Sequence, residues 1–131
     1  MKRVILNWLC FILLVSYPSF AVASLNVTVI NQTGYDLSDV KYVYEVGAHK
    51  TLSGQTQQLT NGGFYNFALS KGGIYRVYAS FMMDGRKVYA KGTANNLEDG
   101  EQYTLTLMKV MLSRGGSGLN FINRSEFDSI K

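Results

Sequence analysis

Residues 73–92 read GIYRVYASFMMDGRKVYAKG, and this stretch predicts a β-hairpin that turns at Asp84-Gly85. An Asp-Gly pair favours a two-residue turn, because its glycine readily adopts the positive φ that such turns require. A turn at this position sets Phe81 opposite Val88 and gathers the apolar residues of both strands on one face. A slip of one residue in the pairing would move the apolar side chains to the opposite face of the sheet, so the pattern also predicts the register.

The opposite face of the predicted hairpin mixes cations with tyrosines. Cross-strand pairing sets Tyr78 beside Lys91 and Ser80 beside Tyr89. Aromatic side chains next to cations are typical of surfaces that recognise an anionic or carbohydrate-bearing partner. A solvated sheet face with no ligand is the alternative interpretation. The candidate binding residues are Arg76, Tyr78, Lys87, Tyr89 and Lys91.

Outside the hairpin, alternating apolar and polar residues predict further strands. These strands span residues 25–31, 40–46, 64–69 and 103–112. Between residues 47 and 63 the pattern is irregular, and Leu52 and Leu59 each suggest a short edge strand. The segment 64–69 leads into the hairpin through a tight turn, which predicts an antiparallel meander of three strands.

No stretch of the chain shows a long helical period, so residues 24–112 are predicted to form one all-β domain. The expected architecture is a single antiparallel β-sandwich (immunoglobulin-like) or a small barrel of about six to seven strands. From Ser113 the composition becomes polar and glycine-rich, which predicts a flexible tail over residues 113–131. A short helical turn beginning near Asn123 or Ser125 is compatible with this tail, which we expect to be loose unless it docks.

The first 23 residues have the three parts of a secretory signal peptide. A basic start at Met1-Lys2-Arg3 precedes an apolar segment over residues 4–15, and Ala21-Val22-Ala23 is a small-x-small cleavage site. The apolar segment is shorter than the roughly 20 residues that span a bilayer. We therefore expect cleavage before Ser24 and a bacterial periplasmic or secreted protein that meets the membrane only during export. A retained N-terminal anchor is the alternative.

Cleavage would also change the composition of the folded chain. Cys10 lies in the signal peptide, so a processed chain of 108 residues would have no cysteine and would depend on its core for stability. Loss of Lys2 and Arg3 would lower the formal charge from +4 to +2. Such a nearly balanced charge gives no indication of a nucleic-acid partner, and we expect none.

Residues suited to catalysis or metal binding are scarce. His49 is the single histidine, it lies in a glycine-flanked polar segment, and no nucleophile motif accompanies it. One histidine without cysteine excludes the usual zinc sites. The acidic residues of the predicted turns lack the spacing of a calcium loop. These acids are Asp36, Asp39, Glu98, Asp99 and Glu101. We expect no catalytic residue, no metal and no cofactor.

Three functional classes remain. We expect a non-enzymatic binding or accessory protein of the inhibitor or immunity type, which presents a sheet face to another protein or to an anionic glycan. A structural or surface-assembly subunit is the first alternative, with an edge strand or the segment 24–31 adding to a neighbour's sheet. A small hydrolase is the second alternative, and the scarcity of catalytic residue types disfavours it.

Overall fold

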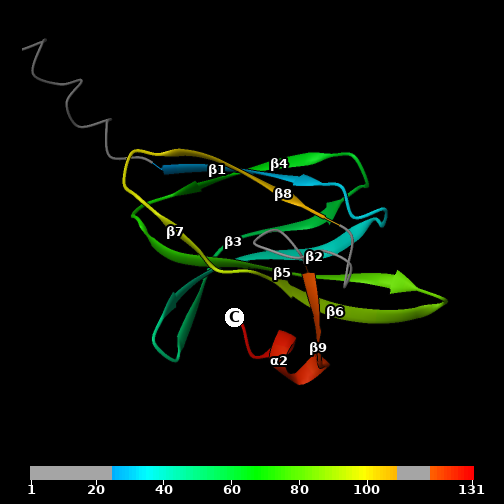
Figure 1. The fold of residues 1–131 in the computed structure, drawn as a ribbon. Helices are drawn as coiled ribbons and strands as arrows, with labels where there is room; N and C mark the ends of the chain where they lie inside the picture. The colour runs from blue at the N-terminus through cyan, green and yellow to red at the C-terminus, as the bar shows by residue number, and fades with distance from the viewer. Residues whose placement is uncertain (1–24, 109–118) are drawn as a thin grey trace, which may run out of the picture.

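A computed structural model describes residues 25–108 and 119–131, which form strands in two sheets and one short helix (Figure 1). The predicted signal peptide, the end of the predicted last strand and the start of the predicted tail lie outside the described residues. The helix is α2 (Arg124–Asp128). The strands are β1 (Leu25–Asn31), β2 (Leu37–Val46), β3 (His49–Leu59), β4 (Phe64–Leu69), β5 (Gly73–Met83), β6 (Arg86–Gly92), β7 (Asn95–Leu97), β8 (Gln102–Leu107) and β9 (Leu119–Ile122).

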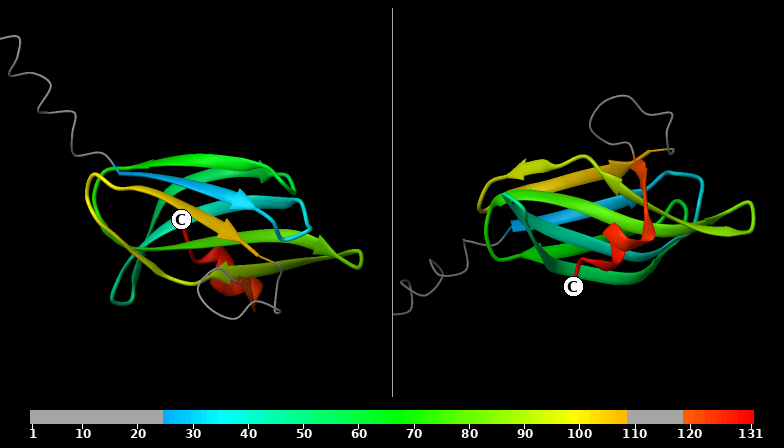
Figure 2. Two further views of the ribbon diagram at one scale, coloured as in Figure 1. Left: turned by 45° about the horizontal axis from the view of Figure 1, so that its top comes forward. Right: turned by 90° about the horizontal axis from the view of Figure 1, so that it is seen from below.

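The two sheets pack face to face, which confirms the prediction of an all-β sandwich (Figures 1 and 2). The smaller sheet has the order β4-β1-β8, and the larger has the order β3-β2-β5-β6-β9, with β7 beside β5. Buried side chains of both sheets meet between them, including Val27 of β1, Tyr42 of β2 and Phe81 of β5. No helix within residues 25–108 or 119–131 is long and apolar enough to cross a membrane.

The hairpin of residues 73–92 has the predicted register. Phe81 lies opposite Val88 and Tyr78 opposite Lys91. Asp84 and Gly85 have φ values of 52° and 77°, so both central residues of the turn adopt positive φ. Such a turn twists with the strands that flank it, which explains why an Asp-Gly pair stands here.

Two predicted strand pairings are wrong. Strand β4 pairs with β1 in the smaller sheet and not with β5, so β4, β5 and β6 form no meander. The short connection after β4 carries the chain from one sheet to the other. Strand β8 lies parallel to β1, which corrects the expectation of a purely antiparallel sandwich. Alternation of apolar residues shows which face of a strand is buried and not which strand lies beside it, so the sequence did not reveal either pairing.

Strand β3 is a single edge strand of 11 residues, where the sequence suggested one or two short ones. The pairing of β2 with β3 is regular except for a shift after Tyr42, which leaves Ser53 as an extra residue. Next to it, Gly54 lies under the ring of Phe67 from β4: a Cβ at Gly54 would be 2.5 Å from Phe67 Cδ1. A side chain this small lets the edges of the two sheets approach closely.

A buried asparagine fixes the connection between β3 and β4. Asn31, at the end of β1, is fully buried, and its Nδ2 donates to the carbonyl oxygens of Leu59 (2.9 Å) and Tyr35 (2.7 Å). Its Oδ1 accepts from the backbone N–H of Thr33 (3.0 Å) and from the Thr33 hydroxyl (2.7 Å). The amide therefore satisfies backbone groups of the β1–β2 connection and of the end of β3.

Candidate functional site

The C-terminal segment docks on the hairpin. Strand β9 pairs with β6, which sets Ile122 opposite Tyr89, and α2 lies over the outer face of the larger sheet (Figures 1 and 2). The side chain of Asn123 caps α2 by accepting from the N–H of Glu126 (2.8 Å), so the helical turn occurs where the sequence suggested it. For residues 119–131, the expectation of a loose tail is corrected, because these residues find an apolar surface to cover.

This docking creates a second, smaller core on the far side of the sheet. It contains Val43 of β2, Tyr78 of β5, and Phe127 and Ile130 of the C-terminal segment. Tyr78 is fully buried. The prediction that Tyr78 lies on a solvated recognition face is therefore wrong, and the physical reason is that the sequence could not show what covers that face.

The other four predicted binding residues make contacts within the protein. The Lys91 ammonium is 2.9 Å from Glu126 of α2, and the Tyr89 ring packs on the ring of Phe127 with centroids 4.9 Å apart. Arg76 is paired with Glu45, and Lys87 lies 3.7 Å from Asp39. The hairpin face thus holds the C-terminal segment, and only part of it is open to a ligand.

Arg76, Tyr78 and Glu45 form a hydrogen-bonded network on β2 and β5. Arg76 Nε donates to Glu45 Oε2 (3.0 Å), and its Nη1 donates to the carbonyl of Gly92 (2.9 Å). The Tyr78 hydroxyl donates to the same Glu45 oxygen (3.2 Å). Burial raises the pKa of Tyr78 well above its usual value, and the negative charge of Glu45 raises it further. This tyrosine therefore stays protonated and acts as a structural donor.

Lys41 anchors the C-terminal segment, and sequence reasoning missed it. Its side chain is buried under α2, where Nζ donates to the carbonyl oxygens of Phe127 (3.1 Å) and Ile130 (3.0 Å). The ammonium also lies 4.1 Å from the centroid of the Phe127 ring. These carbonyls belong to the end of α2, where a cation is favourable. The only signal in the sequence is a lysine that shares a strand face with the apolar Val43.

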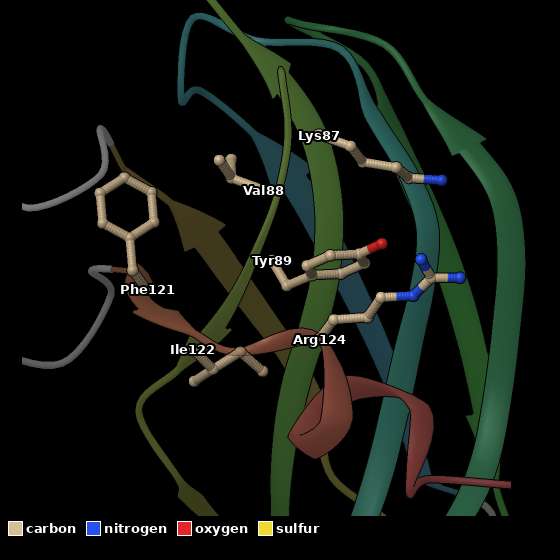
Figure 3. Close-up of a pocket in the computed structure, with 6 residues that line it drawn as sticks. All are labelled: Lys87, Val88, Tyr89, Phe121, Ile122 and Arg124. Atoms are coloured by element: carbon tan, nitrogen blue, oxygen red, sulfur yellow. The ribbon is translucent and has the colours of Figure 1, made fainter.

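A shallow hollow remains open where β9 ends beside β6 (Figure 3). Ile122 is the last residue of β9 and pairs with Tyr89, so Lys87 and Val88 of β6 extend beyond the end of β9. The chain then turns away into α2 at Arg124. The hollow has a volume of about 560 Å³. Its lining residues are Lys87, Val88, Tyr89, Phe121, Ile122 and Arg124.

Three polar ends in this hollow point the same way. Figure 3 shows the Lys87 ammonium, the Tyr89 hydroxyl and the Arg124 guanidinium on one side of β6, with Phe121 and Val88 on the other. The Lys87 and Arg124 side chains are 47% and 76% exposed. Arg124 donates to Asp128 through Nε at 3.2 Å, and its two terminal nitrogens have no hydrogen-bond partner among residues 25–108 and 119–131. Two cations beside a phenol suit a carboxylate, sulfate or phosphate.

The remaining candidates for chemistry lie apart from this hollow. His49 is exposed and opens β3, where it faces Val46 across the turn. Asp36 accepts from the N–H of Asn61 (2.8 Å), and Asp99 accepts from the N–H of Gly72, so both carboxylates stabilise turns. No cluster of three or more His, Cys, Asp or Glu that suits a metal ion occurs among residues 25–108 and 119–131.

Comparison with known proteins gives little to add to this geometry. No protein-family model matches the chain, and no curated protein matches it. The NMR structure of a protein from Eubacterium rectale is similar with a TM-score of 0.47 at 10% sequence identity. The alignment covers 78% of this chain and 89% of the other.

Proposed function

We propose that this protein is an exported, non-enzymatic binding protein that holds an anionic glycan in the hollow beside β6. The arrangement that carries the proposal is the shared direction of Lys87, Tyr89 and Arg124 (Figure 3). Two of these residues belong to the set that the sequence singled out, and Arg124 joins them because α2 docks on the hairpin.

The chemistry of the hollow favours a charged sugar. The terminal nitrogens of Arg124 fit the two oxygens of a carboxylate or sulfate, and the half-exposed Lys87 ammonium, which lies 3.7 Å from Asp39, supplies a second point charge. The Tyr89 hydroxyl is a donor and acceptor for sugar hydroxyl groups. Because the hollow is shallow and the cations are exposed, binding should be weak for one sugar unit and should fall as salt is added.

A titration calorimetry experiment tests the proposal with a sulfated heparin octasaccharide, a polygalacturonate oligomer and a neutral dextran oligomer of similar length. We expect heat from the anionic oligomers only. The double variant Lys87→Ala/Arg124→Ala should bind about 30-fold more weakly, since each exposed charge contact contributes about 1 kcal/mol.

The matched control is Lys71→Ala/Lys131→Ala, which removes two exposed lysines and so changes the net charge equally. It should bind like the unaltered protein. Equal losses in both double variants would show that only net charge matters and would overturn the site. Binding of an acidic peptide in place of every glycan would keep the site and overturn the class of ligand.

Export is proposed from the N-terminal sequence and has its own test. Expression of the full chain in a bacterial host, followed by mass spectrometry of the periplasmic and membrane fractions, should give a chain that begins at Ser24. A chain that retains Met1 in the membrane fraction would support the anchor instead.

A further inference from the structure

One side of the sandwich carries few charged residues, with Lys50 near the start of β3 and Lys71 after β4 at its margin. Residues 51–70 contain no Asp, Glu, Lys, Arg or His, and they include most of β3 and all of β4. Both strands are terminal in their sheets. They lie at the same side of the molecule, because the ring of Phe67 from β4 covers Gly54 of β3 (Figures 1 and 2). We call this surface the β3–β4 wall.

The β3–β4 wall lacks the usual protection of a free sheet edge. Exposed edges are normally blunted by lysine, proline or short strands, since their unpaired N–H and C=O groups pair readily with another strand. Strand β3 has 11 residues, and its proline-free stretch from Gly54 to Leu59 is regular and charge-free. The extra residue at Ser53 interrupts the edge only before this stretch.

Exposed aromatic residues accompany the unprotected edge. Tyr65 of β4 lies on the strand face that meets β3 and is 38% exposed, whereas Phe64 before it is 65% exposed on the outer face of the smaller sheet. Tyr65 packs edge-on against Phe67 with ring centroids 4.8 Å apart, which places it next to the Gly54 contact between the two strands. Large exposed apolar side chains beside a free edge are typical of a protein–protein interface.

We infer that the β3–β4 wall pairs with the same wall of a second copy of this chain, through antiparallel β3–β3 contact. A two-fold axis sets the strand against its own sequence, so any charged residue near the axis would meet a like charge. Because residues 54–59 carry no charge, two copies of this stretch can pair without repulsion between like charges. Directly opposite residues in an antiparallel pair share a face, so the two-fold axis must pass through a residue and not between two residues. The absence of charge places that residue within the 54–59 stretch.

The opposite ends of the larger sheet differ in this respect. Strand β9 has four residues and leads directly into α2, whereas β3 has 11 residues and pairs regularly from Gly54 to Leu59. Of the segment 24–31, the other candidate for strand addition, the described residues 25–31 have no free edge. Its strand β1 lies at the centre of the smaller sheet, between β4 and β8.

Sedimentation velocity over a concentration series tests this inference, with the protein purified as its host processes it and the N-terminus established by mass spectrometry. We expect a monomer–dimer equilibrium. The variant Gln55→Lys/Gln57→Lys places like charges across the axis and should weaken dimerisation by about tenfold or more. The control Gln102→Lys/Thr104→Lys adds the same charge at two exposed positions of β8, the edge of the smaller sheet that lies away from β4, and should leave the dimer intact.

Circular dichroism establishes that both variants keep the strand signal. A chain that stays monomeric at all concentrations overturns the inference. A dimer that survives the Gln55/Gln57 variant, or that both variants disrupt equally, also overturns it. Amide hydrogen exchange gives a second measurement: dimerisation should slow exchange at residues 54–59, and unchanged exchange there would contradict β3–β3 pairing.

Discussion

Replacement of Lys41 by methionine should release the C-terminal segment while leaving the main sandwich folded. Methionine keeps the unbranched apolar stem of lysine and is one atom shorter, but it cannot donate, so the carbonyl oxygens of Phe127 and Ile130 lose their partner. Hydrogen bonds from a charged donor contribute about 1.5–3 kcal/mol each. The ammonium also loses its position over the Phe127 ring, a contact of about 0.5–2 kcal/mol.

An opposing effect reduces these losses. The buried ammonium has no carboxylate within 4.0 Å among the described residues, and its burial costs free energy that methionine does not incur. We therefore expect a net weakening of docking by about 2–4 kcal/mol. Burial of Phe127 and Ile130 contributes only about 3–6 kcal/mol, from which the ordering of the segment must be subtracted. A loss of this size is enough to detach α2.

Amide hydrogen exchange measures this release directly. A weakening of about 2 kcal/mol corresponds to roughly 30-fold faster exchange at residues 125–131, with little change in β1 or β5. The control is Lys50→Met, because the Lys50 ammonium is partly exposed and lies 4.0 Å from Glu126. An ion pair of that kind contributes at most about 1 kcal/mol. Protection of α2 that is the same in Lys41→Met as in the unaltered chain would refute the anchoring role.

Three further changes test other parts of the structure. The Tyr42 hydroxyl is buried with no hydrogen-bond partner among the described residues. Tyr42→Phe should therefore leave the free energy of unfolding in urea unchanged or raise it by about 1 kcal/mol. A loss above about 1 kcal/mol would show that the hydroxyl does have a partner. Gly54→Ala should lower stability by about 1–3 kcal/mol by displacing the Phe67 ring, and Phe67→Leu in the same chain should restore part of the loss in a thermal melt. The pKa of Tyr78 is raised above the ordinary value of 10.0, so the unfolded chain loses this proton first. The contribution of Tyr78 to the free energy of unfolding is therefore fully present below pH 10 and falls above it, by up to about 1.4 kcal/mol per pH unit. In urea titrations from pH 9 to 11.5, the variant Tyr78→Phe should lose stability less steeply than the unaltered protein.

Lys41 and Lys87 show how much of the candidate site could be predicted from the sequence. Lys87 lies at the hollow, as its place on the polar face of the hairpin allowed, while Lys41 is buried under a segment 86 residues away. Each lysine lies in a strand next to a valine, Val40 for Lys41 and Val88 for Lys87, so the local sequence does not separate them. What separates them is whether α2 covers the face, which depends on contacts between distant parts of the chain.

The fold itself divides in the same way. The sequence by itself determined the all-β class, the Asp84-Gly85 turn and the register of β5 with β6, because alternation and turn geometry act between near neighbours along the chain. Only the tertiary structure decided that β4 and β8 flank β1, that β3 is a long free edge, and that residues 119–131 close the outer face of the hairpin. Those choices depend on which buried surfaces fit together across large separations in sequence, and alternation is the same whichever partner a strand takes.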